Sequence, residues 1–161
     1  MMTAATQSIP VGEFVSSSER ETFDLGVRIG NQLSGGEILL LNGSLGAGKT
    51  ILVKGIARAL GLDDEEVTSP SFTLVNPHNG RLLLYHIDLY RLDEGASAAY
   101  AVDLEEILAD ENAVIVIEWA ERMGRYPLPA GAWRISINGD GDAPRFISIN
   151  MLESSGLGKN Q

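Results

Sequence analysis

Residues 43–50 have the residue types and the spacing of a loop that binds phosphate. The segment reads Gly-Ser-Leu-Gly-Ala-Gly-Lys-Thr and fits the pattern G-x-x-x-x-G-K-T. Several backbone N–H groups must point inward together to hold a polyphosphate, and glycines let the chain curl that tightly. Lys49 can reach the β- and γ-phosphates, and the Thr50 hydroxyl can ligate Mg²⁺. We therefore expect the whole loop to bind a nucleotide, through Gly43, Ser44, Leu45, Gly46, Ala47, Gly48, Lys49 and Thr50.

A carboxylate from another strand usually completes such a magnesium site, and Asp88 is one candidate. It lies in His-Ile-Asp-Leu-Tyr-Arg (86–91), where strand alternation predicts one face with His86, Asp88 and Tyr90. We expect Asp88 to ligate the metal or to orient its waters, with His86 and Tyr90 beside it or facing a partner. His86 as a lone catalytic base is a weaker hypothesis. The alternative is an edge strand whose polar face is solvated.

Glu118 is the second candidate acid, at the end of the apolar run Ala113–Ile117. Carboxylates at the carboxyl end of such a strand can ligate Mg²⁺ through water, or position and deprotonate the water that attacks a γ-phosphate. The alternative is a solvated acid at the end of a strand. Trp119, the next residue, fits core packing better than rim packing on sequence alone.

The order of apolar segments predicts a three-layer α/β domain with a mixed, mostly parallel central sheet, as in P-loop nucleotide hydrolases. Ser18 and Glu21 resemble a capping box that opens a helix, and Gly35-Gly36 would end it. A strand leads into the loop at 43–50 and a helix follows it, which argues against an isolated glycine-rich turn. The expected strands are 37–41, the hairpin within 72–91, 113–118, 133–138 and 145–150, and the expected helices after the first are 49–60 and 98–108.

Length and composition limit the class of protein. The 161 residues suit one globular domain over 13–150, between a flexible tail at 1–12 and a disordered tail at 151–161. The chain has no cysteine and no apolar run long enough to span a bilayer, so we expect a cytoplasmic protein without membrane contact. Its net charge of −10 makes it a poor nucleic-acid binder by itself, because phosphate backbones attract basic proteins.

Taken in order, these motifs resemble the TsaE (YjeE) family of bacterial tRNA-modification ATPases. The phosphate loop is followed by Thr-Ser-Pro-Ser-Phe-Thr-Leu-Val (68–75), then by 86–91 and by Glu-Trp (118–119). The loop alone is generic, whereas the ordered set is specific and covers roughly 16–150. Ser71 stands where the family usually has threonine, and 98–108 lacks a glycine that the family usually carries there.

The resemblance implies an ATPase, with ATP and Mg²⁺ as cofactors, that supports N6-threonylcarbamoyladenosine (t6A) formation at tRNA position 37. Its partners would be a complex of TsaB and TsaD, where TsaD is the transferase, and tRNA would be held only through them. Position by position, the resemblance gives Lys49 a phosphate contact, and assigns catalytic or metal-binding roles to Thr50, Asp88 and Glu118. It also ties Trp119 to activity and makes Ser69–Thr73 a switch-like segment near the γ-phosphate.

Two other functions remain open from the residues alone. A small P-loop kinase would need a mobile lid with several arginines, and Arg122–Arg125 offers only two. Arg91 and Arg122 are possible phosphate contacts, although surface salt bridges suit both better. A nucleotide-dependent binding switch would work without meaningful turnover. A GTPase is disfavoured, because the chain has no Asn-Lys-x-Asp sequence.

Overall fold

A single seven-stranded sheet organises the chain. The computed structural model describes residues 9–44, 46–63, 67, 75–90, 104–123, 127–128 and 131–152. The strands are β1 (Gly12–Ser16), β2 (Ile38–Gly43), β3 (Val75–Asn79), β4 (Leu83–Asp88), β5 (Val114–Glu118), β6 (Trp133–Asn138) and β7 (Arg145–Met151). The helices are α1 (Glu19–Asn31), α2 (Lys49–Ala59), α4 (Leu104–Leu108) and the 3₁₀ helix η2 (Ala120–Met123).

The sheet is parallel in its centre and antiparallel at both flanks. Its spatial order is β1-β7-β6-β2-β5-β4-β3. β2 runs parallel to both β5 and β6, and β4 runs parallel to β5. The hairpin β3–β4 and the pairs β6–β7 and β1–β7 are antiparallel. This confirms the predicted α/β class and the predicted hairpins; β1 was not predicted, and Ile9, within the segment expected to be a tail, is buried.

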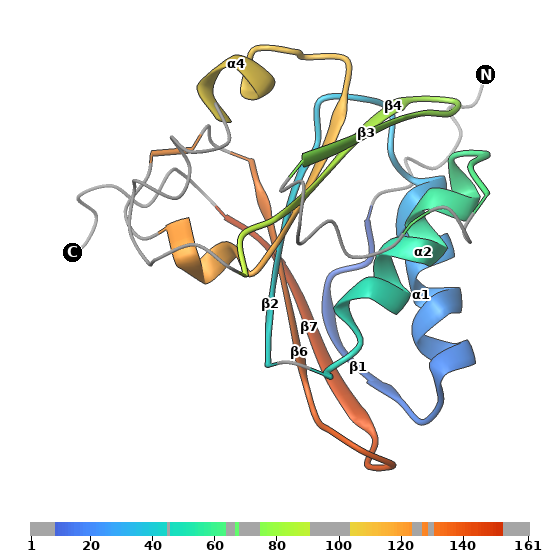
Figure 1. Ribbon diagram of the computed structural model, residues 1–161. Helices are drawn as coiled ribbons and strands as arrows, with labels where there is room; N and C mark the ends of the chain where they lie inside the picture. The colour runs from blue at the N-terminus through green and yellow to red at the C-terminus, as the bar shows by residue number, and fades with distance from the viewer. Residues whose placement is uncertain are drawn as a thin grey trace, which may run out of the picture.

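Alternating side chains of the central strands supply two separate cores, which explains the three layers. On β2, Leu39 and Leu41 pack beneath α1 and α2, whereas Ile38 and Leu40 pack on the opposite face. The second core includes Leu104 of α4 and Met123 of η2. Figure 1 shows α1 and α2 together on one side of the sheet, with α4 and η2 on the other. Because both faces are covered, the central strands are almost wholly apolar.

Local signals in the sequence set the ends of α1. Ser18 is its N-cap, and its hydroxyl accepts the N–H of Glu21 at 3.1 Å. The Glu21 carboxylate accepts the N–H of Ser17 at 2.6 Å, so the Ser18 half of the predicted capping box forms and the return bond goes to the residue before the N-cap. The predicted helix at 98–108 is described only over Leu104–Leu108, where it is helical; the rest lies outside the described residues.

Glycines let α1 and α2 approach closely. A Cβ atom at Gly55 would collide with the carbonyl oxygen of Phe23, and one at Gly26 would collide with that of Leu52. This contact fixes α2, and therefore the loop that precedes it, against the rest of the domain. None of the helices in the described part of the chain has the length and apolar character needed to cross a bilayer.

Candidate functional site

The loop at 43–50 connects the end of β2 to the start of α2, as the sequence predicted. Gly43 packs so closely on β6 that a Cβ atom there would lie 2.5 Å from the carbonyl oxygen of Ile137. Gly48 is the N-cap of α2, with φ +107°, and no side chain caps this helix. The backbone N–H groups of the first turn are therefore available to an anion, which the helix dipole also favours. Leu45 lies outside the described residues.

Lys49 folds back over its own loop. Its side chain is buried, and its Nζ atom donates to the carbonyl oxygens of Gly43 at 2.5 Å and Ser44 at 3.0 Å. The ammonium group also lies 4.0 Å from the ring centroid of Trp119, which gives a cation–π contact. Burial lowers the pKa of Lys49, and the nearby carboxylates of Glu118, Glu121 and Asp88 oppose that shift. A phosphate group would replace the carbonyl contacts with a charged partner.

Thr50 and Glu118 meet across the site although 68 residues separate them. The Thr50 hydroxyl donates to the two carboxylate oxygens of Glu118, at 3.4 and 3.5 Å. Glu118 is only 2% exposed, which excludes the alternative of a solvated acid at a strand end. The register pairs Glu118 with Asp88 on β4, and Asp88 is 1% exposed. The two predicted acids thus lie side by side at the carboxyl ends of neighbouring parallel strands.

His86 adds a partner for Glu118 that sequence reasoning did not identify. Its Nε2 atom lies 2.5 Å from Glu118 Oε2, and the ring is completely buried. Its Nδ1 atom has no hydrogen-bond partner within the described structure. β4 lies between β3 and β5, so the alternative of an edge strand with a solvated face is wrong.

Tyr90 lies beyond β4 rather than on its polar face, which corrects the predicted alternation. β4 ends at Asp88, and the Tyr90 N–H donates to Asp88 Oδ1 at 2.9 Å. The Tyr90 ring instead contacts Trp119, with 4.9 Å between the ring centroids. Trp119 has a left-handed backbone, φ +59°, which is strained for a bulky residue. Its side chain is partly buried and packs against the second hydrophobic core, as expected, while its ring also contacts Lys49.

These oxygens have the chemistry that Mg²⁺ prefers, although they do not form a complete cage. Among the described residues, no group of three or more His, Asp or Glu side chains is arranged to hold a metal. Thr50, Asp88 and Glu118 offer a hydroxyl and two carboxylates at one edge of the sheet. Magnesium commonly takes one or two carboxylates and completes its shell with waters and phosphates, so this incomplete set fits a metal that arrives with a nucleotide.

The structure describes only some of the residues singled out from the sequence. Ser69 and Thr73 of the expected switch segment lie outside the described residues, as do Arg91 and Arg125. Arg122 lies at the site, with its guanidinium carbon 5.6 Å from the centroid of the Trp119 ring. Sequence reasoning missed Arg145, which contacts the loop from β7, because nothing in its local sequence marks it.

Comparison with known proteins gives consistent results. A family model described as "Threonylcarbamoyl adenosine biosynthesis protein TsaE" matches residues 16–147. A curated protein of Treponema pallidum named "tRNA threonylcarbamoyladenosine biosynthesis protein TsaE" is 42% identical over 139 residues, covering 84% of this chain and 97% of its own. A Nostoc protein of the same name is 39% identical over 113 residues, 69% of each chain.

A solved structure agrees with the sequence matches. The one described as "Crystal structure of Bacillus subtilus YdiB" superposes with a TM-score of 0.70 at 30% identity, covering 87% of this chain and 84% of that one. Together these matches confirm the family resemblance that the ordered motifs indicated.

Proposed function

Since the chain belongs to the TsaE family, we propose that it is a Mg²⁺-dependent ATPase that supports the formation of N6-threonylcarbamoyladenosine in tRNA. In this proposal it acts on a complex of TsaB and TsaD in the cytoplasm and does not itself transfer the threonylcarbamoyl group. The observation that carries the ATPase part is the contact between Thr50 and Glu118. It joins a phosphate-binding loop to a buried acid, the two parts that nucleotide hydrolysis requires.

The proposed roles follow from the position of each side chain. Lys49 leaves the carbonyls of its own loop and holds the β- and γ-phosphates. Thr50, Asp88 and Glu118 hold the magnesium ion, which when bound neutralises charge on the phosphate oxygens. Glu118 also orients the attacking water and accepts its proton, and His86 keeps that carboxylate in place through the 2.5 Å contact.

The candidate site contains few positively charged side chains, which explains why partners would raise the rate of ATP hydrolysis. Lys49 is the only lysine or arginine among the buried residues of the described structure. Phosphoryl transfer accelerates strongly when a second cation stabilises the transition state, and such a group can come from another protein.

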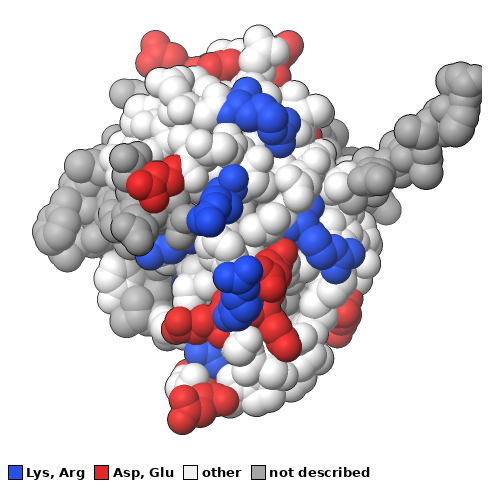
Figure 2. Space-filling model, turned by 90° about the vertical axis from the view of Figure 1, so that its right-hand side faces the viewer, with Lys and Arg blue, Asp and Glu red and all other residues white. Residues whose placement is uncertain are grey.

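Surface charge supports the proposal that tRNA is held by the partners. The whole chain carries a net charge of −10. On the face drawn in Figure 2, Lys and Arg side chains are interspersed with Asp and Glu side chains and form no continuous basic surface. Proteins that bind a nucleic-acid phosphate backbone without a partner usually concentrate positive charge on one face.

Steady-state ATP hydrolysis tests the proposal. The rate is measured for this chain alone, for purified TsaB–TsaD alone and for the mixture, with Lys49→Ala as the control. We expect a slow rate alone and strong stimulation in the mixture that the Lys49→Ala variant loses. Absence of both stimulation and complex formation would overturn the partner assignment. Support of t6A formation by a non-hydrolysable ATP analogue, equal to that by ATP, would instead favour a binding switch.

A further inference from the structure

Trp119 has a backbone conformation that its surroundings must maintain. Its φ of +59° lies in the left-handed region, which is unfavourable for a bulky side chain. Such strain persists only where neighbouring contacts hold the residue firmly, and it is typical of active sites and switch segments. Trp119 stands between Glu118, the buried acid at the end of β5, and the short helix η2. The contacts that hold η2 in place therefore also hold the Trp119 ring beside the phosphate loop.

A polar contact joins η2 to the end of β2, the strand that leads into the phosphate loop. The side-chain amide of Asn42 faces two acceptors, the carbonyl oxygen of Leu41 and Oε1 of Glu121. Only the amide nitrogen can satisfy two acceptors, and it donates to them at 3.3 Å and 3.2 Å respectively. Within the described structure, η2 contacts β2 more than it contacts any other helix or strand. The bond between Asn42 and Glu121 thus lies in the main contact that η2 makes.

This bond closes a ring of contacts that includes Lys49. From Glu121 the ring passes along η2, where the Arg122 N–H donates to the carbonyl oxygen of Trp119 at 3.0 Å. The Trp119 ring lies 4.0 Å from the Lys49 ammonium group. That ammonium group donates at 2.5 Å to the carbonyl oxygen of the residue that follows Asn42. Asn42 and Glu121 therefore support the position of Lys49 although neither of them contacts its carbonyl partners.

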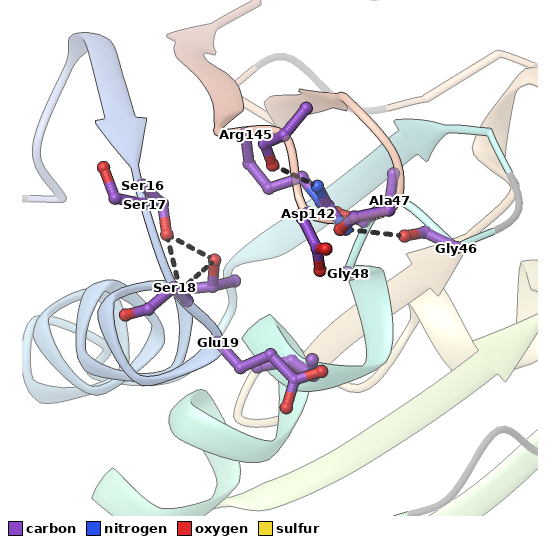
Figure 3. A pocket seen from close by; sticks show the side chains of 13 residues that line it. Ser16, Ser17, Ser18, Glu19, Gly46, Ala47, Gly48, Asp142 and Arg145 are labelled. Carbon is purple, nitrogen blue, oxygen red and sulfur yellow. Dashed lines mark hydrogen bonds between the residues drawn. The ribbon is translucent and has the colours of Figure 1, made fainter.

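The opposite flank of the loop is fastened by a side chain from β7. The Arg145 guanidinium donates to the carbonyl oxygens of Ala47 at 3.0 Å and Gly46 at 3.2 Å (Figure 3). It also donates to two carbonyl oxygens of the turn between β6 and β7, at 2.6 and 3.2 Å. Because this flank is tied down, we expect the rearrangement that releases Lys49 to fall on the flank where Trp119 and η2 lie.

The charge of Glu121 acts on Lys49 as well, but more weakly than the hydrogen bond. Burial lowers the pKa of Lys49, and Glu121 is one of three carboxylates that oppose this shift. Glu121 is exposed, so water and salt screen its attraction for the ammonium group. The hydrogen bond to Asn42, in contrast, fixes the position of η2. The bond and the charge can therefore be separated by substitution.

We propose that Glu121 is a positioning residue for Lys49: its hydrogen bond with Asn42 holds η2 against β2 and so keeps the Trp119 ring over the ammonium group. The inference rests on the proposed function, because a phosphate ligand is what requires Lys49 to leave this position. The bond stabilises the nucleotide-free arrangement and not the nucleotide-bound one. It therefore lowers the affinity for nucleotide by the free energy that is lost when the ring of contacts opens.

Three substitutions separate the hydrogen bond from the charge. Asn42→Ala removes the donor and keeps the charge, Glu121→Gln removes the charge and keeps an acceptor oxygen, and Glu121→Ala removes both. Titration with Mg²⁺-ATP should give about two- to tenfold tighter binding in Asn42→Ala and in Glu121→Ala, the range that one hydrogen bond supplies. Combining these two substitutions should add nothing further. Glu121→Gln should restore the affinity of the unsubstituted chain, and Asn138→Ala, at an exposed asparagine of β6, is the control.

The emission of Trp119 gives a second readout that needs no nucleotide. In Trp133→Phe, Trp119 is the only tryptophan of the chain. Adding Asn42→Ala to that chain should increase the quenching of its emission by acrylamide, because the ring is no longer held over Lys49. Adding Glu121→Gln, which keeps the hydrogen bond, should leave the quenching as it was.

Both readouts must change together for the inference to stand. A change in Asn42→Ala in only one of them, or in neither, overturns it and leaves the proposed function intact. Tighter binding in Glu121→Gln and Glu121→Ala alike, with Asn42→Ala unchanged, would show that Glu121 acts only by repelling phosphate. Failure of the unsubstituted chain to bind Mg²⁺-ATP overturns the proposed function and the effect on affinity with it, whereas the quenching still decides whether the bond positions Trp119.

Discussion

His86 and Glu118 contact each other diagonally across two buried parallel strands, with 2.5 Å between Nε2 and Oε2. The register pairs His86 with Val116, and Asp88 with Glu118, so the two side chains lie two register positions apart and therefore on the same face. Glu118 also accepts from the Thr50 hydroxyl. The carboxylate is therefore held from two sides, by a strand and by the helix that follows the phosphate loop.

Glu118→Gln should separate nucleotide binding from hydrolysis. The amide keeps the size of the side chain and can still accept from Thr50, but it cannot take a proton from water. We expect kcat for ATP hydrolysis to fall by about 10²–10⁴-fold while the affinity for ATP is largely kept, measured with TsaB–TsaD present. Glu111→Gln, at an exposed acid, is the control. Turnover equal to that of the unsubstituted chain would contradict the catalytic assignment.

His86→Leu should destabilise the protein through Glu118. The substitution removes one of the two hydrogen-bond partners of a buried carboxylate, which we expect to lower the free energy of unfolding by about 1–3 kcal/mol. Urea denaturation measures this loss in the unsubstituted background and again in Glu118→Gln. Because the carboxylate is absent from the second background, the loss there should be smaller. An equal loss in both would show that His86 contributes only by packing.

Lys49 should make stability depend on pH in the absence of nucleotide. Burial lowers its pKa from 10.5, so the folded protein releases this proton at a lower pH than the unfolded chain does. The unfolded state then binds more protons just below 10.5, and stability rises with pH there. The unsubstituted chain should therefore gain stability relative to Lys49→Met as pH is raised toward that value. A constant difference between the two urea denaturation curves would contradict the lowered pKa.

The fluorescence of Trp119 should report nucleotide binding. The Lys49 ammonium lies 4.0 Å from its ring, and it must leave to hold phosphate. In Trp133→Phe, where Trp119 is the only tryptophan, Mg²⁺-ATP should change the emission intensity or wavelength. Adding Lys49→Met to that chain should abolish the change. Emission that responds to ATP equally with and without Lys49 would assign the signal to another movement.

Gly55→Ala should be strongly destabilising because the helices have no room for a methyl group. Its Cβ would collide with the carbonyl oxygen of Phe23 and force α1 and α2 apart. We expect a loss of about 3 kcal/mol in the free energy of unfolding. Gly61→Ala is the comparison, since its Cβ meets open space and only its positive φ opposes it, at a cost of about 1–2 kcal/mol. A smaller loss at Gly55 than at Gly61 would contradict this close packing.

Local sequence patterns predicted the helices, strands and loops more accurately than they predicted the contacts between them. The phosphate loop, the capped helix α1 and the apolar strand ending at Glu118 could be read from residue types and spacing, because each depends on neighbours in sequence. Tyr90 was placed wrongly since strand alternation was carried past Asp88, where β4 ends. β1 was missed because a short strand at the start of the chain has little apolar pattern of its own.

The sequence by itself determined that a loop with the phosphate-binding pattern lies between a strand and a helix, and which two acids could serve it. Only the tertiary structure decided that His86 contacts Glu118, and that Arg145 fastens the loop from 98 residues away. Strand order and register bring those pairs together, and they arise from packing the whole sheet between its two cores. A contact between segments that are far apart in the chain leaves no pattern among neighbouring residues, so residue types and their spacing cannot predict it.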